Sequence, residues 1–166
     1  MLRMRKRRSS KFYRQVRRDA RSYGLTPPFQ PLDLLAIMAA RRKLKPRLRP
    51  KDMSGEADYG FCMREEDGWL VLYYRPDVSM IGELISQWHE VREAIVMEEE
   101  RAAGVLGAGK PRHRGGMFNT EHELDIEGWA TEMALFGLFG DDAPGAEDAI
   151  AGVESPFDSL LEELDS

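Results

Sequence analysis

The chain has 166 residues, of which 42% are hydrophobic and 32% charged, so it can bury the core of one domain and is not globally disordered. No stretch approaches the roughly 20 apolar residues of a membrane span, and no apolar segment follows the charged N-terminus, so we expect neither a membrane protein nor a secretory signal. The net charge of −5 is unevenly distributed along the chain. Residues 1–51 carry 17 Lys and Arg and 2 acids, whereas residues 52–166 carry 7 Lys and Arg and 27 acids.

Residues 1–30 are predicted to form a basic N-terminal arm. Ten of the first 23 residues are Lys or Arg, and Phe12, Val16 and Ala20 recur every four residues, which is typical of a short helix with one thin apolar stripe. We expect the arm to contact the phosphates of a nucleic acid, another polyanion or an acidic protein surface. A solvated tail, or one that folds back on the acidic C-terminus, is the alternative. The expected contact residues are Arg3, Arg5, Lys6, Arg7, Arg8, Lys11, Arg14, Arg17, Arg18 and Arg21.

Residues 31–140 are predicted to form one α+β domain. An aspartate can cap the helix predicted over residues 33–43, and residues 44–57, with two prolines and several charges, are predicted to be a connector. Two apolar or aromatic runs, Tyr59–Met63 and Trp69–Tyr74, flank turn residues. The pattern predicts a β-hairpin or small antiparallel sheet packed on helices. The single cysteine lies in the first run, where it excludes an internal disulfide and favours a reducing, cytoplasmic location.

The second half of the domain is predicted to be helical. Residues 79–100 carry the strongest signal, because apolar residues recur at +4, +7 and +11 after Leu84, and a serine or aspartate can cap the start. A basic, glycine-rich loop over residues 102–118 and a helix over residues 123–139 follow. Residues 141–166 carry nine acids and no Lys or Arg, so they are predicted to be a flexible acidic tail.

The residues with the clearest chemistry lie in the first of these two helices. His89 and Glu93 are four positions apart, so both side chains would project from one helical face onto one metal ion. Glu90, directly after the first ligand, would lie beside the metal and could deprotonate water. A further ligand is expected from another helix, and Glu127 there begins a Glu-x-x-Ala pattern with Ala130.

With these motifs the chain resembles the ImmA/IrrE group of metallopeptidase-like proteins, which are common in bacteria, phages and mobile elements. The resemblance covers about residues 31–139 and implies a zincin-like domain. It implies a zinc ion held by His89, Glu93 and Glu127, with manganese as the alternative metal because two of the ligands are carboxylates. Glu93 stands where the group has a second histidine.

The resemblance also implies an activity. A protein substrate would lie along the sheet edge near Trp69–Tyr74, and a regulatory protein would be cleaved by metal-activated water with Glu90 as the general base. The same resemblance also allows a degenerate member of the group that has no catalytic activity. Either His113 or His122 could replace the missing histidine. The alternative function is a non-enzymatic nucleic-acid-binding or phage assembly protein that acts through its arm and tail.

Overall fold

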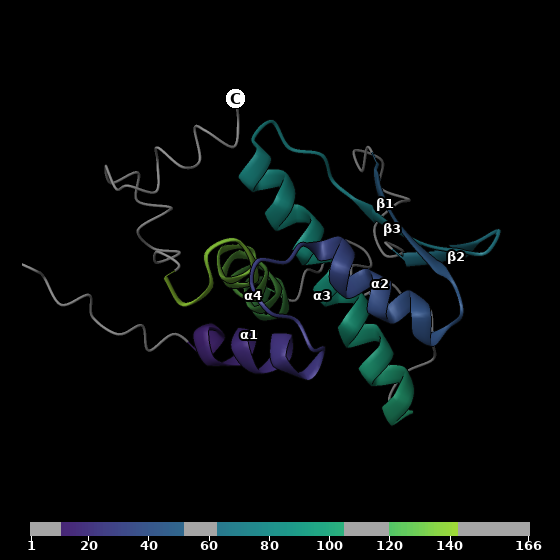
Figure 1. Cartoon of the computed structure of the whole chain (residues 1–166), viewed down its shortest axis with the longest axis horizontal. Helices are drawn as coiled ribbons and strands as arrows, with labels where there is room; N and C mark the ends of the chain where they lie inside the picture. Colours follow the sequence, from purple (N-terminus) through teal and green to yellow (C-terminus); the bar gives the residue numbers. More distant parts are fainter. Residues whose placement is uncertain (1–10, 52–62, 105–119, 143–166) are drawn as a thin grey trace, which may run out of the picture.

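A computed structural model describes residues 11–51, 63–104 and 120–142 (Figure 1). In this part of the chain the fold is α+β, as predicted, with four helices and a small three-stranded mixed sheet. No helix in these ranges is long and apolar enough to cross a lipid bilayer. The helices are α1 (Lys11–Ser22), α2 (Pro31–Arg41), α3 (Met80–Ala103) and α4 (Thr120–Phe139), and a short 3₁₀ turn, η2 (Gly140–Asp142), follows α4.

Local capping sets the ends of α2 and α3. Ser79 caps α3, as predicted, because its side chain accepts a hydrogen bond from the Gly82 amide, and Gly104 ends the helix in the left-handed conformation with φ 66°. The capping residue of α2 is not the aspartate that was predicted. Gln30 is the capping residue, and Asp33 accepts a hydrogen bond from the Gln30 amide at 2.7 Å, which completes a capping box three residues into the helix.

The sheet contains β1 (Lys45–Pro50), β2 (Met63–Glu66) and β3 (Trp69–Tyr74) in the order β1-β3-β2. The predicted hairpin is present, since β2 and β3 pair antiparallel around Asp67 and Gly68, both with positive φ. Residues 59–62 of its first predicted strand lie outside the described residues.

Two predictions about the sheet are wrong. The segment predicted to be a connector contains β1, which pairs parallel with β3, so the sheet is mixed and not purely antiparallel. Pro46 and Pro50 are compatible with this strand because β1 lies at an edge, where a missing backbone N–H is tolerated. β3 is the central strand of the described sheet, so a substrate at the sheet edge near Trp69–Tyr74 would meet β1 or β2, and this position stays a prediction.

The hydrophobic core lies between the sheet and the helices. Leu70 and Leu72 of β3 are fully buried against α2 and α3. Trp88 of α3 is also fully buried, and its ring meets Phe29 at 5.8 Å and Trp129 of α4 at 6.0 Å in edge-to-face geometry. These contacts fix α3 against α4, and this pairing determines which polar side chains of the two helices meet.

α1 belongs to the same core, although it falls within the interval predicted to be an arm. Val16 and Ala20, two residues of the predicted apolar stripe, are buried against the core at 0% and 1% exposure. Gly128 of α4 allows this close contact, because an added Cβ atom would clash with the ring of Phe12. α1 packs on α4 on the side away from the sheet (Figure 1).

Candidate metal centre

α3 presents His89 and Glu93 on one face, one helical turn apart, as the sequence predicts. The adjacent Trp88 and Val91 are fully buried in the core, which fixes the rotation of the helix about its axis. Glu93 is itself only 6% exposed, and the His89 side chain is 19% exposed. A carboxylate with so little contact with water requires polar or cationic partners.

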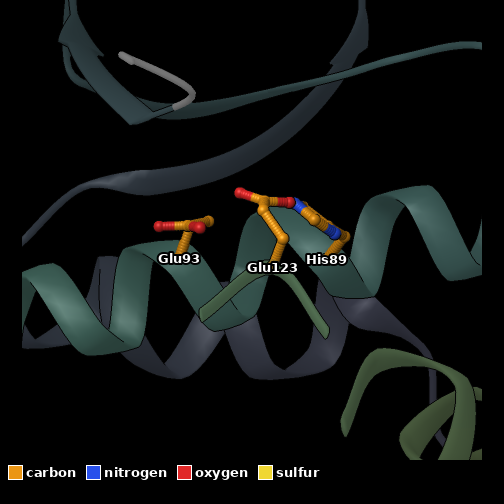
Figure 2. Close-up of side chains that lie close together, drawn as sticks. All are labelled: His89, Glu93 and Glu123. Carbon is orange, nitrogen blue, oxygen red and sulfur yellow. The ribbon is translucent and has the colours of Figure 1, made fainter. Parts of the chain in front are cut away.

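α4 supplies the third member of the cluster, Glu123. One ligating atom from each of His89, Glu93 and Glu123 lies within 4.8 Å of the other two, so this group could hold a metal ion (Figure 2). His89 Nε2 and Glu123 Oε2 are 3.7 Å apart. Two ligands at about 2.0–2.2 Å from a tetrahedral zinc would be separated by about 3.3–3.6 Å, so small side-chain movements would give coordination distances.

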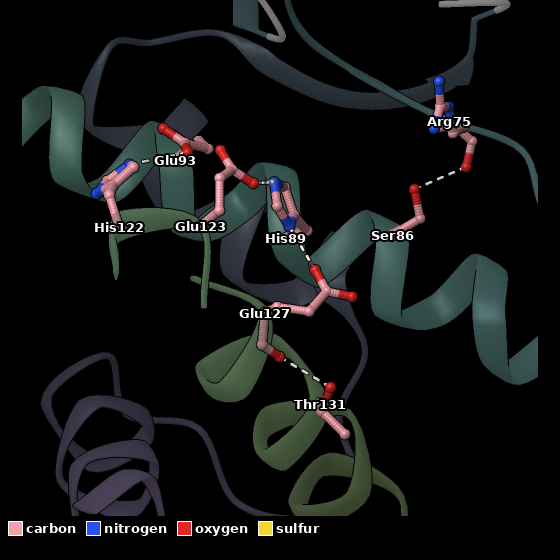
Figure 3. A network of polar contacts seen from close by, with 8 residues as sticks. All are labelled: Arg75, Ser86, His89, Glu93, His122, Glu123, Glu127 and Thr131. Atoms are coloured by element: carbon pink, nitrogen blue, oxygen red, sulfur yellow. Dashed lines mark hydrogen bonds and ion pairs between the residues drawn. The ribbon is translucent and has the colours of Figure 1, made fainter. Parts of the chain in front are cut away.

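Glu127, the third ligand expected from the resemblance, lies on the other side of the imidazole. Its Oε2 is 2.7 Å from His89 Nδ1, while Nε2 of the same ring faces Glu123 (Figure 3). Glu127 is not part of the metal-compatible group, and its side chain is 57% exposed. The carboxylate accepts a hydrogen bond from Nδ1–H and so orients the ring, a role that outer carboxylates commonly have behind metal-binding histidines.

A second imidazole lies beside the cluster. His122 of α4 is within hydrogen-bonding distance of Glu93, with 3.0 Å between Nε2 and Oε1 (Figure 3). His122 is one of the two histidines considered as a replacement for the missing second histidine, and the other, His113, lies outside the described residues. The contact holds the buried Glu93 carboxylate on the side opposite His89.

The electrostatic environment of His89 strongly favours a cation. Burial is the largest single influence on the His89 pKa and lowers it, but the hydrogen bond to Glu127 and the charges of Glu90, Glu127 and Glu123 together outweigh burial. The pKa of His89 is therefore raised from 6.5 to about 9. Without a metal the ring is an imidazolium at neutral pH, and metal binding would have to displace its proton.

The metal-free protein is expected to lose stability as the pH rises. The protonated His89 ring stabilises the fold, because its folded-state pKa is above its unfolded value. This contribution is fully present below pH 6.5 and is lost as the pH passes about 9. We expect a loss of about 2 kcal/mol, since solvent at the exposed Glu127 screens part of the interaction. Urea unfolding of wild type and His89→Gln at about pH 6 and about pH 10 measures it. A fall of equal size in the variant would contradict the assignment.

Glu90, the predicted general base, is half-buried on α3 next to His89. Its charge contributes to the raised pKa of His89, so its carboxylate is electrostatically coupled to the cluster. It is not among the three residues whose ligating atoms converge. Its position is compatible with a base beside the cluster, and its catalytic role stays a prediction.

The basic residues expected to bind nucleic acid fall into three sets. Lys11 and Arg17 form ion pairs with acids near the two ends of α4, Asp125 at 2.6 Å and Asp141 at 3.0 Å. The guanidinium of Arg17 also lies over the ring of Tyr13. Three others are exposed on α1, at spacings of four and three residues: Arg14, Arg18 and Arg21. The remaining five lie outside the described residues: Arg3, Arg5, Lys6, Arg7 and Arg8.

No protein-family model, curated protein or solved structure matches the chain. The resemblance to the ImmA/IrrE group therefore stays a prediction.

Proposed function

We propose that this protein is a metallopeptidase-like protein of the ImmA/IrrE type, with a zincin-like domain whose ligands are His89, Glu93 and Glu123. The observation that carries the proposal is the convergence of these three side chains from two helices that pack directly on each other. Glu127 supports it independently, because it holds His89 Nδ1 and leaves Nε2 facing the cluster.

The donor set fits a divalent cation. One imidazole nitrogen and two carboxylates form a ligand set that zinc accepts, with a fourth position for water. Two carboxylates also make manganese a plausible competitor, since oxygen ligands favour harder metals. The acidic surroundings that raise the pKa of His89 attract any cation, so the preference for zinc rests on the imidazole.

The proposed activity is hydrolysis of a peptide bond in a regulatory protein. A bound cation would supply Lewis-acid activation of water and of the substrate carbonyl. Glu90 would accept a proton from the attacking water and return it to the leaving amine nitrogen. Glu127 would keep the His89 ring in one tautomer and orientation, and His122 would hold the carboxylate of Glu93.

Metal content and hydrolysis of labelled casein by the zinc-loaded protein test the proposal. We expect near-stoichiometric zinc or manganese by elemental mass spectrometry, and its loss in His89→Ala. Glu90→Gln should keep the metal and lower hydrolysis by about 100-fold or more, because only the base is removed. Glu99→Gln, an exposed acid on the same helix, is the matched control. Absence of metal after zinc loading would refute the site, and undiminished hydrolysis in Glu90→Gln would refute the base.

A second candidate function is polyanion binding by the basic N-terminal segment. The exposed row of Arg14, Arg18 and Arg21 on α1 favours it, because their spacing places three cations along one helical face. Changing these three arginines to Gln tests it and leaves Val16 and Ala20 in the core, whereas deletion of α1 would remove them. Weaker binding of a labelled oligonucleotide is the expected result.

A further inference from the structure

The face of the sheet that points away from the helices is basic and aromatic. Leu70 and Leu72 point into the core, so Trp69 and Tyr73, which alternate with them along β3, point the opposite way. Residues paired across neighbouring strands share a face, and the registers pair Lys45 with Trp69 and Arg49 with Tyr73. Arg47 and Arg64 pair with Val71, which lies between these rings and is 1% exposed. We call this surface the outer sheet face: Lys45, Arg47, Arg49, Arg64, Trp69 and Tyr73.

Cations and rings are in direct contact on the outer sheet face. The guanidinium carbon of Arg47 lies 4.0 Å from the centre of the Trp69 ring, and the Lys45 ammonium lies 5.5 Å from it. At the other end of β3, the Lys51 ammonium lies 5.4 Å from the Tyr73 ring. Such contacts hold long basic side chains above the sheet and give the face a positive charge beside flat apolar surfaces.

An acid on this face is already engaged. Glu66 pairs with Trp69 in the register, and its Oε1 accepts a hydrogen bond of 2.6 Å from the Tyr73 hydroxyl. This bond ties the Tyr73 ring of β3 to a side chain of β2. With four cations around two fixed rings, the face remains complementary to a polyanion.

We propose that the outer sheet face binds single-stranded nucleic acid. The four cations would contact phosphates, and bases would displace Arg47 from the Trp69 ring and Lys51 from the Tyr73 ring, which are about 13 Å apart along one strand, to stack there. An acidic peptide would use the cations but not the rings, and a duplex keeps its base faces stacked internally. The surface is distinct from the basic row on α1, because α1 packs on α4 on the side away from the sheet (Figure 1).

Charge-neutralising variants of the full chain separate the two basic surfaces. Fluorescence anisotropy with a labelled oligothymidine of about 20 nucleotides measures affinity at several salt concentrations. A triple variant that changes Lys45, Arg49 and Arg64 to Gln should bind the oligonucleotide about tenfold or more weakly. The slope of log affinity against log salt concentration should fall by about 2, because each of the three lost phosphate contacts contributes roughly 0.7. The matched control, with the exposed Arg41, Lys43 and Arg101 changed to Gln, should keep most of the affinity. A third variant, with the three exposed arginines of α1 changed to Gln, measures the share of that separate surface. Equal losses in the first two variants would overturn the proposal.

Tryptophan fluorescence tests the stacking directly. Trp88 and Trp129 are fully buried, whereas Trp69 is only partly buried, so quenching by the oligonucleotide should come from Trp69. We expect Trp69→Phe to abolish the quenching and Trp69→Ala to weaken binding by about 5- to 150-fold. Wild type that binds without quenching, or that binds duplex as tightly as the single strand, would overturn the proposal. Binding seen only after removal of residues 143–166 would do the same, by identifying the acidic tail as the occupant.

Discussion

Glu123→Gln is expected to weaken zinc binding about 100- to 1000-fold, whereas Glu127→Gln should weaken it only about 10- to 100-fold. The first change removes an oxygen that lies 3.7 Å from His89 Nε2, on the cluster side of the ring. The second removes the carboxylate that accepts a hydrogen bond from Nδ1–H on the far side of the ring. Structural zinc sites bind with about 10–16 kcal/mol shared over four ligands, or roughly 3 kcal/mol each.

Competition titration against a chromophoric chelator measures both affinities. Asp125→Asn is the matched control, because Asp125 is an exposed acid on α4 that pairs with Lys11 and lies outside the cluster. Its zinc affinity should equal that of wild type. The reverse order, with Glu127→Gln the more damaging, would restore the ligand set expected from the sequence and exclude Glu123.

Trp129→Phe is expected to destabilise the fold by about 1.5–3 kcal/mol more than Trp88→Phe. Both side chains are fully buried, so the loss of ring volume should cost each variant a similar amount. Only Trp129 also loses a charge-assisted hydrogen bond, since its Nε1 donates to Asp19 Oδ2 at 2.9 Å, and Arg92 Nη1 lies 4.0 Å from the same oxygen. Trp88 Nε1 has no hydrogen-bond partner among the described residues.

Urea unfolding, with a circular dichroism check that each variant is folded, gives the two free energies of unfolding. A double-mutant cycle with Asp19→Ala then isolates the hydrogen bond, since the difference between the tryptophan variants should shrink in that background. Two variants of equal stability would show that the Asp19 bond contributes nothing.

Elements specified by local signals were predictable from the sequence. The period of apolar residues and the Ser79 cap predict α3, and Asp67 and Gly68 predict the turn between β2 and β3. His89 and Glu93 were predicted on one face for the same reason, because residues four apart on a helix share a face whatever surrounds it.

The features that were missed depend on contacts between distant segments. β1 resembles a connector because it alternates prolines and charges, and only its pairing with β3 makes it a strand. Glu123 was missed in favour of Glu127, one turn later on the same face of α4. The packing of Trp129 on Trp88 fixes the position of α4 along the axis of α3. This position places Glu123 at the cluster and Glu127 behind His89.

The docking of α1 on α4 has a consequence for when α1 can fold during synthesis of the chain. Asp19 bonds to Trp129 and Arg17 pairs with Asp141, which join residues 110 and 124 positions apart in the chain. α1 therefore lacks its main packing partner until α4 has been synthesised, and its earlier contacts are limited to neighbours such as Arg92 of α3. Burial of α1 should follow the synthesis of α4, so this part of the molecule should not fold from its N-terminal side as the chain emerges.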